Sequence, residues 1–450
     1  MFKYESDSRK VTKGQTFVAL KGMTVDGHDY INNAIENGAS AIICEKDIDV
    51  NVPYTKVDNT DTYLRKILND EYGKDIDKMT LIGVTGTNGK TTSCYLIYQM
   101  LNNLGIDTAY IGTLGYYHKD DFVELNNTTP DVLTIYKLLY KAYESGAKSV
   151  VMEVSSQALS YDRLTNINYS IIGFTNLTED HLDYHKTMDD YKKAKQKLFG
   201  MLRNSRYAII NSDDKYYRDF MFENNYNVTV GKYGNFRIKD VKLNQSSIDI
   251  VFDYKKEYHK SINMVGKYNA YNYLEAVLSL VCLGFDLEEL LKLDVEAPPG
   301  RMYIVNYKTN TIFIDYAHTP DAMENVLKSV KCFCKNKIIT IFGCGGNREK
   351  TKRSIMGDIA TRYSDFVIIT NDNPRYEEED DIINDIAKGI SKSNYEIIKD
   401  REDAIKKGIG YLENNDILLV LGKGHENYQI IGSNKIHFDD LEIVKKYVNF

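Results

Sequence analysis

The stretch Leu81-Ile82-Gly83-Val84-Thr85-Gly86-Thr87-Asn88-Gly89-Lys90-Thr91-Thr92 contains the pattern that decides the fold. The apolar run from residue 81 to 84 predicts a buried strand, and a helical pattern follows the last threonine. Between them, glycines let backbone N–H groups close on phosphates, Lys90 supplies a positive charge, and a hydroxyl of Thr91 or Thr92 can reach Mg²⁺. The strict GxxxxGK[ST] pattern has glycine where this chain has Val84. Because strand, Gly-Lys-Thr-Thr and helix occur in the right order, the stretch predicts a phosphate-binding loop.

Acidic and histidine side chains follow two further predicted strands. Glu153 ends the run Val150-Val151-Met152, where a carboxylate beside a phosphate loop suits Mg²⁺. The strand from Tyr169 to Phe174 leads into Thr175-Asn176-Leu177-Thr178-Glu179-Asp180-His181-Leu182-Asp183-Tyr184-His185. Ligands of open α/β sheets lie beyond the carboxyl ends of the strands, so we expect these side chains to face the phosphates. A GTPase is disfavoured because neither Asn-Lys pair of the chain continues into the base-reading NKxD tetrapeptide.

The rest of the chain predicts an α/β protein of three domains. At about 150 residues per domain, 450 residues are enough for three. The charged stretch Asn69 to Lys78 and the Pro-Pro-Gly at 298–300 mark the joints. We therefore expect a small α/β domain at residues 1–78, a central parallel-sheet domain with the phosphate loop at 79–297, and a Rossmann-like α/β domain at 298–450. Further strands are predicted at 15–20, 39–44, 207–210, 311–317, 337–342, 366–370 and 417–421.

Composition excludes several classes of protein. Apolar residues make up 43% and charged residues 27%, and no uncharged apolar run reaches the length of a membrane-spanning helix. The net charge of −7 and the absence of a basic block argue against nucleic acid as a partner. The six cysteines lack the spacing of a zinc site and are expected to be reduced. The N-terminus has no secretion signal, so the expected location is the cytoplasm.

Distinctive motifs are spread over the whole chain. They are Gly86 to Thr92, Asn127-Thr128-Thr129-Pro130, Glu153-Val154-Ser155-Ser156, Thr175-Asn176-Leu177 with Asp180 to His185, Tyr191-Lys192-Lys193-Ala194-Lys195, Gly266 to Asn272, Gly300-Arg301, Asp315 to Asp321, Gly343 to Arg348, Asp372-Asn373-Pro374-Arg375 and Gly422-Lys423-Gly424-His425-Glu426. Together they resemble the motifs of the Mur ligases of peptidoglycan synthesis. Within the family, the chain is most similar to the ligases that act on UDP-MurNAc-L-Ala-D-Glu.

The resemblance implies a uridine-nucleotide domain, an ATPase domain and a domain that brings in an amino acid. ATP converts the carboxylate of D-Glu into an acyl phosphate, and an amine attacks it to give an amide, ADP and phosphate. A carboxylate is a poor electrophile at neutral pH, so phosphorylation supplies the leaving group, while Lys90 and Mg²⁺ neutralise the charge on the moving phosphoryl group. ATP and Mg²⁺ are the implied cofactors, and a monomer is expected.

The resemblance also assigns roles to individual residues. The catalytic set is Lys90, Glu153, His181 and Lys195, and the metal ligands are Thr91, Glu153, His181 and Lys195 as a carbamate. ATP contacts are Gly86, Thr87, Asn88, Gly89, Lys90, Thr91, Thr92, Asn272, Arg301 and Asp315. Contacts with the uridine-linked substrate are Ser8, Asn127, Thr128, Thr129, Ser155 and Arg163. Many relatives carry His where this chain has Gln157 and Gln where it has Tyr161, which concerns substrate contacts and not the reaction.

The added amino acid is expected to be meso-diaminopimelate. In the resembled family the tetrapeptide Asp372-Asn373-Pro374-Arg375 accompanies this substrate, and an Arg fork can hold its second carboxylate. The other matching positions are Arg348, Gly422 and Glu426, with Glu426 suited to the distal ammonium. Three alternatives stay open: the same ligase using L-lysine or another diamine, a folylpolyglutamate synthase-like ligase, and an inactive paralogue with a binding role.

Overall fold

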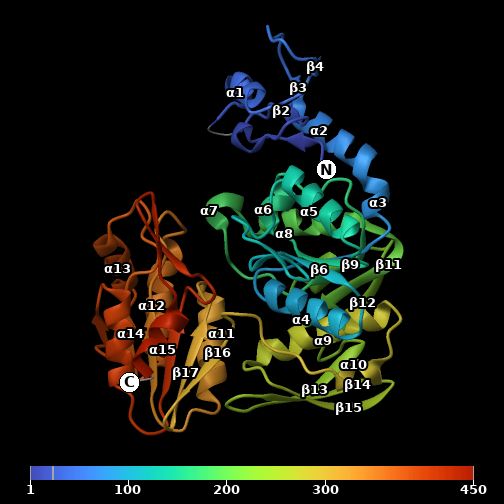
Figure 1. The fold of residues 1–450 in the computed structure, drawn as a ribbon. Helices are drawn as coiled ribbons and strands as arrows, with labels where there is room; N and C mark the ends of the chain where they lie inside the picture. The colour runs from blue at the N-terminus through green and yellow to red at the C-terminus, as the bar shows by residue number, and fades with distance from the viewer. Residues whose placement is uncertain (1, 23–24, 449–450) are drawn as a thin grey trace.

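The computed structural model describes residues 2–22 and 25–448, which form three lobes (Figure 1). Each lobe contains one of the three large sheets, and the sheets lie within the three ranges expected from the sequence. The limits 1–78, 79–297 and 298–450 themselves stay a prediction. None of the helices in the described ranges combines the length and the apolar character that crossing a membrane requires.

The N-terminal lobe is built on a parallel sheet of four short strands in the order β1-β2-β3-β4. Its elements are β1 (Tyr4–Glu5), β2 (Thr16–Val18), β3 (Ala41–Cys44), β4 (Tyr54–Lys56), α1 (Ile31–Glu36) and α2 (Thr60–Leu68). The strands predicted at 15–20 and 39–44 are confirmed as β2 and β3, in shorter form.

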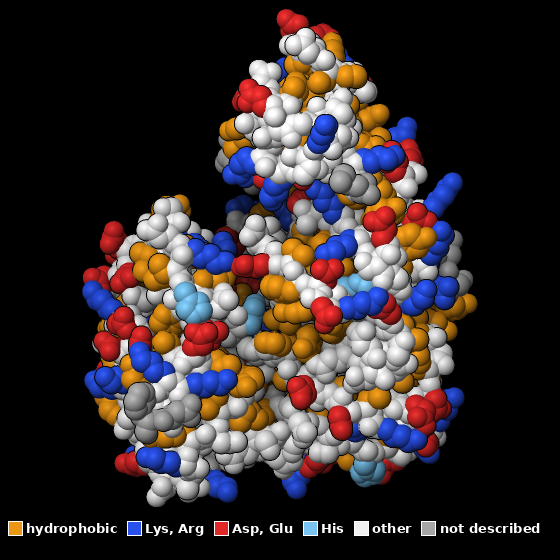
Figure 2. Space-filling model, in the orientation of Figure 1, with side chains coloured by type: hydrophobic (Ala, Val, Ile, Leu, Met, Phe, Trp, Pro, Cys, Tyr) orange, Lys and Arg blue, Asp and Glu red, His pale blue; other side chains and the backbone are white. Residues whose placement is uncertain are grey.

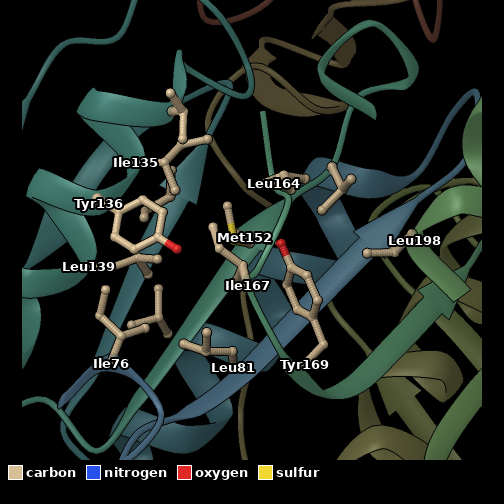
Figure 3. Packing of buried hydrophobic residues seen from close by; sticks show 14 of the residues in the cluster. Ile76, Leu81, Ile135, Tyr136, Leu139, Met152, Leu164, Ile167, Tyr169 and Leu198 are labelled. Carbon is tan, nitrogen blue, oxygen red and sulfur yellow. Dashed lines mark hydrogen bonds between the residues drawn. The ribbon is translucent and has the colours of Figure 1, made fainter. Parts of the chain in front are cut away.

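The predicted first joint is helical. From α2 the chain continues through a π-helical turn, Asn69–Gly73, into α3 (Lys74–Ile76). Ile76 is buried in the core of the central lobe, in one cluster with Leu81 and Tyr136 (Figure 3). The link between the two lobes is therefore fixed to the central lobe by apolar packing.

The central lobe is one sheet of 11 strands, in the order β15-β14-β13-β12-β11-β10-β5-β9-β6-β7-β8. The strands are β5 (Thr80–Thr85), β6 (Thr108–Gly112), β7 (Gly115–His118), β8 (Asp121–Val123), β9 (Ser149–Glu153), β10 (Tyr169–Phe174), β11 (Leu202–Asn211), β12 (Tyr226–Gly231), β13 (Phe236–Leu243), β14 (Ile248–Tyr254) and β15 (Lys256–Ile262). The strands from β13 across to β6 pair in parallel, as expected, whereas β14, β15, β7 and β8 pair antiparallel at the two ends. In β14, buried residues alternate with partly exposed ones, the pattern of a strand with one face in water.

Helices cover both faces of this sheet and bury two separate apolar clusters. They are α4 (Lys90–Asn103), α5 (Val132–Glu144), α6 (Ser156–Ser160), α7 (Leu182–His185), α8 (Met188–Gln196), α9 (Lys267–Cys282) and α10 (Leu287–Lys292). On one face, Tyr169 of β10 donates a hydrogen bond to the Met152 sulfur at 3.1 Å, below the α5 side chains Ile135 and Tyr136 (Figure 3). On the other face, α4 and α9 pack on each other and on the sheet. The phosphate loop lies at the start of α4 and is thereby attached to rigid elements.

The C-terminal lobe has a sheet of six strands in the order β16-β17-β21-β18-β19-β20, all parallel except β16. Its strands are β16 (Tyr303–Tyr307), β17 (Asn310–Asp315), β18 (Ile338–Phe342), β19 (Phe366–Ile369), β20 (Tyr395–Ile397) and β21 (Ile417–Leu421), with a separate hairpin β22 (Tyr428–Ile431) and β23 (Asn434–His437). The helices are α11 (Pro320–Lys331), α12 (Thr351–Tyr363), α13 (Glu379–Ala387), α14 (Arg401–Gly410) and α15 (Asp440–Val448). The four strands predicted in this region are confirmed as β17, β18, β19 and β21.

A buried carboxyl group lies between α4 and α9. Glu275 is 3% exposed, and its Oε2 accepts a hydrogen bond of 3.2 Å from the Ser93 hydroxyl. Its Oε1 is buried and has no hydrogen-bond partner in the described part of the chain. Burial raises the pKa of Glu275 to about 8, so the group is largely protonated at neutral pH.

We predict that the stability of the Glu275→Gln variant, relative to that of the wild type, increases as the pH rises. The folded protein retains the Glu275 proton up to about pH 8, whereas the unfolded chain releases it near a pKa of about 4.3. Wild-type stability therefore falls between these values, by about 1.4 kcal/mol per pH unit at most, and the amide does not share this loss. Melting temperatures of both proteins at pH 5 and pH 8 measure the difference. Glu288→Gln, at an exposed position, is the control. A difference in melting temperature between Glu275→Gln and wild type that is the same at both pH values would contradict the prediction.

Candidate active site

The phosphate loop passes between the end of β10 and the helix α9. It connects Thr85, the last residue of β5, to Lys90, the first residue of α4. Gly86 and Gly89 have φ angles of 153° and 87°. A Cβ atom on Gly86 would collide with the Thr175 hydroxyl, and one on Gly89 would lie 2.5 Å from the Asn272 amide oxygen. Both glycines are needed because other residues rarely adopt these φ angles and because a side chain at either position would strike its neighbours.

Two lysines converge on the carbonyl oxygen of Gly86. Lys90 donates to Gly86 O at 2.9 Å and to Thr87 O at 2.8 Å, and Lys195 donates to Gly86 O at 2.7 Å. Lys195 is 1% exposed, and its Nζ lies 4.5 Å from the centre of the Tyr191 ring. Burial, reinforced by the charge of Lys90, lowers the pKa of Lys195 well below its ordinary value. A helix lysine that would ordinarily be exposed is therefore a buried amine beside the phosphate loop.

Glu153 is fully buried at the end of β9 and is surrounded by donors. Its oxygens accept hydrogen bonds from the Thr91 hydroxyl at 2.9 Å, from the Thr113 hydroxyl at 3.1 Å, from the Thr113 N–H at 2.8 Å and from the Tyr110 hydroxyl. The predicted partners Thr91 and Glu153 are thus in direct contact. Tyr110 and Thr113 were not among the predicted site residues, because nothing in the sequence marks which strand lies beside β9.

His181 lies in the loop after β10 with a φ angle of 56°. Its Nε2 is 3.4 Å from a carboxylate oxygen of the buried Asp180. Burial lowers the pKa of His181, and the charges of Lys195 and Lys90 act in the same direction while Asp180 opposes them. Among the described residues, no three His, Cys, Asp or Glu side chains form a group that could hold a metal. The predicted metal set contains two of these residue types, with Thr91 and a modified Lys195 as the others.

Residues of the C-terminal lobe reach the phosphate loop. Arg301 donates to the Thr91 hydroxyl at 3.2 Å and stacks on Tyr316, with its Cζ 4.5 Å from the ring centre. Asp321, at the start of α11, accepts a hydrogen bond of 2.9 Å from the Asn88 side chain. The predicted ATP residues Arg301 and Asn88 therefore each form a hydrogen bond between the two lobes, with Thr91 and Asp321 respectively. Asp321 was not among the predicted site residues.

The other two predicted nucleotide residues lie at the edge of this junction. Asn272 is buried on α9 and donates to Asn269 Oδ1 at 2.9 Å. Asp315, at the end of β17, accepts hydrogen bonds from the Met302 N–H at 2.7 Å and the Ala317 N–H at 2.8 Å. Burial raises the pKa of Asp315.

Four of the six residues predicted for the uridine-linked substrate form one hydrogen-bonded group with Glu153 and Thr113. The Thr129 hydroxyl donates to Glu153 O at 2.8 Å and accepts from the Ser155 N–H at 3.0 Å, Arg163 donates to Thr129 O at 2.9 Å, and the Thr128 and Thr113 hydroxyls are 3.0 Å apart. Asn127 is exposed next to this group. Ser8 lies apart from it, in the N-terminal lobe, where its carbonyl accepts from Asn37 at 3.0 Å. Of the two departures, Gln157 is exposed on α6, and Tyr161 packs against the Tyr184 ring.

Arg375 and Arg348 form a pair of like charges in the C-terminal lobe. Arg375 has a φ angle of 53°, and its guanidinium donates to the carbonyls of Gly346 at 2.9 Å and Asn373 at 3.4 Å. Burial, followed by the charge of Arg348, lowers the pKa of Arg375. Within residues 2–22 and 25–448, neither guanidinium has a carboxylate within 4.0 Å. Two neighbouring guanidinium groups without an ion-pair partner are suited to bind an anion.

The remaining residues predicted for the amino acid meet at the ends of β19 and β21. Asn373 donates to Glu426 Oε2 at 2.9 Å, and Gly422 faces the carboxylate of Asp372. The carbonyl of Pro374 lies against Gly346, which keeps the loops after β18 and β19 together. Lys423, which lies in the motif between Gly422 and Glu426 and was not among the predicted site residues, is fully buried and donates to both Asn373 and Glu426.

The surface is hollowed where the three lobes meet, and basic, acidic and histidine side chains surround this hollow (Figure 2). Direct contacts hold the two larger lobes together beside it. Lys435 of β23 pairs with Glu124, just after β8, at 2.7 Å.

Comparison with known proteins identifies related chains over the whole length. Three family descriptions match: "Mur ligase family, catalytic domain" at residues 4–72, "Mur ligase middle domain" at 84–280, and "Mur ligase, glutamate ligase domain" at 300–424. A UDP-N-acetylmuramoyl-L-alanyl-D-glutamate--2,6-diaminopimelate ligase of Bacillus cereus is 42% identical over 99% of this chain and 93% of its own. A protein of the same name from Aquifex aeolicus is 41% identical over 98% of this chain and 92% of its own.

A solved structure, also described as a UDP-N-acetylmuramoyl-L-alanyl-D-glutamate--2,6-diaminopimelate ligase, superposes with a TM-score of 0.68. It is 30% identical and covers 100% of this chain and 95% of its own. The sequence matches, the shared three-lobed fold and the phosphate loop agree with one another, and the chain belongs to the Mur ligase family.

Proposed function

We propose that this protein is an ATP-dependent ligase that adds meso-diaminopimelate to the D-Glu carboxylate of UDP-MurNAc-L-Ala-D-Glu through an acyl phosphate. The names of the 42% and 41% identical relatives state this pair of substrates. The observation on this chain that carries the proposal is the pair Arg375 and Arg348, two neighbouring guanidiniums without a carboxylate partner among the described residues. A substrate with a second carboxylate supplies the missing partner.

The phosphate end of the reaction rests on Lys90 and the glycines of its loop. Lys90 donates hydrogen bonds to two carbonyls of its own loop at 2.8 and 2.9 Å. These bonds keep its ammonium beside the loop that we propose binds the phosphates of ATP. Arg301, attached to the Thr91 hydroxyl, brings a second positive charge from the C-terminal lobe. Both charges oppose the negative charge that develops on the transferred phosphoryl group. The other proposed ATP contacts are Gly86, Thr87, Asn88, Gly89, Thr92, Asn272 and Asp315.

The residues proposed to hold Mg²⁺ have suitable chemistry. Glu153 and Thr91 present oxygen atoms, which Mg²⁺ prefers, and they are already in contact at 2.9 Å. His181 follows on the neighbouring loop. When bound, Mg²⁺ would neutralise phosphate charge and orient the oxygens of ATP.

Lys195 fits the set only as a carbamate. An ammonium there would repel a cation, whereas a carbamate is an anion. The lowered pKa of this buried amine favours the neutral form, which is the form that attacks CO₂. Attack on CO₂ would form an N–C bond, open one C=O π bond to give a carboxylate oxygen and release one proton from the nitrogen, which would place an anionic group beside Gly86 and the phosphate loop.

The two ends of the substrates are proposed to meet at the junction of the lobes. Thr129, Ser155 and Arg163 form one hydrogen-bonded group around the backbone of Glu153, which suits them to hold the UDP-linked dipeptide close to the phosphates. Thr128, Asn127 and Ser8 complete the proposed contacts. On the other side, Arg375 and Arg348 would hold the distal carboxylate, and Glu426 the distal ammonium, leaving the other amine free to attack the acyl phosphate. Asp372, Asn373, Pro374 and Gly422 form the frame of this site.

The alternatives have less support. L-lysine lacks the second carboxylate and would leave both guanidiniums unpaired. No observation on the site favours a folylpolyglutamate synthase-like activity, and the presence of Lys90, Glu153, His181 and Lys195 disfavours an inactive paralogue. The monomeric state and the cytoplasmic location stay predictions.

We predict that Lys195→Ala is nearly inactive and that short carboxylates such as acetate or formate restore part of the activity. The substitution removes the site of the carbamate, and a small anion can occupy the space left behind. ADP release coupled to product formation measures both effects. Lys193→Ala, two residues earlier and exposed on α8, is the control that should retain activity. Fully active wild-type enzyme with an unmodified lysine, determined by mass spectrometry, would refute the carbamate.

We predict that Arg375→Ala raises KM for meso-diaminopimelate strongly and hardly affects lysine. Removing one partner of a desolvated charge pair costs about 2 to 5 kcal/mol, which is well over tenfold in kcat/KM. Steady-state kinetics with both amino acids, for wild type and variant, test this.

Arg362→Ala serves as the matched control for Arg375→Ala, because Arg362 is half-exposed on α12 and pairs with Asp358. A wild type that prefers lysine, or an equal loss for both amino acids, would show that Arg375 supports loop structure instead of recognition.

A further inference from the structure

Lys423 is a fully buried lysine in the amino-acid site that the proposed mechanism does not use. Its side chain is 0% exposed, and its ammonium lies 3.3 Å from Glu426 Oε2 and 3.3 Å from Asn373 Oδ1. Burying a charged amine is costly unless it is paired. Its two hydrogen-bond acceptors, Asn373 and Glu426, both belong to the predicted amino-acid site.

Among the described residues, Glu426 receives two hydrogen bonds on one oxygen and none on the other. Asn373 donates to Oε2 at 2.9 Å, and Lys423 donates to the same atom. In the described ranges, Oε1 has no hydrogen-bond partner, and the Glu426 side chain is 14% exposed. Two donors thus fix the direction of the carboxylate and leave one oxygen available for a ligand.

We propose that Lys423 is a positioning residue, whose ammonium keeps the buried Glu426 ionised and turned so that Oε1 can receive the distal ammonium of a diamino acid. This inference deepens the proposed function and rests on it. It assigns Lys423 no contact with the substrate.

The charges around Glu426 explain why a lysine is needed. Burial raises the pKa of Glu426, and the neighbouring Asp372 carboxylate raises it further, while Lys423 and Asn373 lower it. The titratable and charged groups facing Glu426 are Asp372, Lys423, Arg375, Arg401, Tyr316 and Tyr428. Of the three cations, Arg401 already pairs with Asp440 at 2.8 Å, and Arg375 is assigned to the substrate carboxylate. Lys423 is the cation in direct contact with the carboxylate, so its removal would shift Glu426 toward the neutral acid at neutral pH.

The test is the pH dependence of KM in Lys423→Met. A protonated Glu426 cannot accept the ammonium as an ion pair, so KM for meso-diaminopimelate should rise about tenfold at pH 7, the effect of one pKa unit, with kcat changed less than about twofold. The ratio of variant to wild-type KM should fall as the pH rises from 6 to 9, because Glu426 then becomes ionised in both proteins. The KM for lysine should follow the same course, since lysine carries the same distal ammonium. Arg375→Ala, in contrast, is expected to affect only the dicarboxylate.

A double-mutant cycle with Glu426→Gln separates this role from a general loss of structure. If Lys423 acts through Glu426, the KM of the double variant should be no higher than that of Glu426→Gln alone. Neither variant should show a ratio to the wild-type KM that falls as the pH rises. Lys423→Gln, which keeps a hydrogen-bond donor and loses only the charge, should shift the profile in the same direction and serves if Lys423→Met does not fold. The control is Lys337→Met. Lys337 forms an exposed ion pair with Glu413 just before the start of β18, away from the amino-acid site.

Three results would overturn the inference. They are a KM ratio that is constant with pH, additive losses in the cycle, and an equal rise in KM for ATP. A wild type that ligates neither diamino acid would overturn the proposed function together with the inference. An active wild type, with Lys423 variants whose KM values equal those of the wild type at every pH, would overturn the inference alone.

Discussion

The close passage of the phosphate loop between β10 and α9 is the constraint on which the rest of the structure depends. The loop fits there because Gly86 and Gly89 have no side chain to strike Thr175 and Asn272. This close fit directs Lys90 and Lys195 onto the same carbonyl, at 2.9 and 2.7 Å. It also places Thr91 against Glu153 at the end of β9. One backbone path thus brings together residues from α4, α8, β9 and α9 and from the end of β10.

Burial of charge beside this loop is costly, and the structure compensates for it unevenly. Glu153 has four donors around its two oxygens, whereas the amine of Lys195 has one acceptor and an aromatic ring. In the C-terminal lobe, Arg401 and Asp440 are fully buried and satisfy each other at 2.8 Å, while Arg348 and Arg375 repel each other and, among the described residues, neither has a carboxylate within 4.0 Å. Satisfied buried pairs maintain a fold, and unsatisfied charges mark the places where a ligand can supply the missing partner.

The lobes contribute to the site from three separate sheets and are joined by both polar and apolar contacts. Arg301 reaches Thr91, Asp321 reaches Asn88, and Lys435 pairs with Glu124, so the C-terminal lobe contacts the central lobe at the phosphate loop and at its β8 edge. The N-terminal lobe is joined to the central lobe by the helix that ends at Ile76, which packs in the central core, and by the ion pair between Glu5 and Lys137 at 2.5 Å. The phosphate loop and the residues proposed for the amino acid thus belong to two different lobes that are in direct contact.

The sequence by itself determined the local features of this protein. The order of strand, glycine loop and helix located the phosphate site, because that pattern is short and is decided by neighbouring residues. The apolar runs located the buried parallel strands β5, β9, β10 and β21 to within one or two residues. The motif resemblance determined the family, which the comparisons confirmed.

Only the tertiary structure decided which distant residues meet. The antiparallel strands at both ends of the central sheet were not predicted, because their alternating, partly polar pattern resembles that of a solvated segment. Apart from the family resemblance, nothing near Lys195 in the sequence distinguishes it from Lys193, yet Lys195 is buried against the loop and Lys193 forms an exposed pair with Asp189. Likewise, the sequence shows Lys423 only as one residue of a glycine-containing motif. The contacts of its ammonium with Asn373 and Glu426 exist because β19 and β21 end close together. Burial and charge pairing depend on strand order, and strand order depends on contacts between residues that are far apart in the chain.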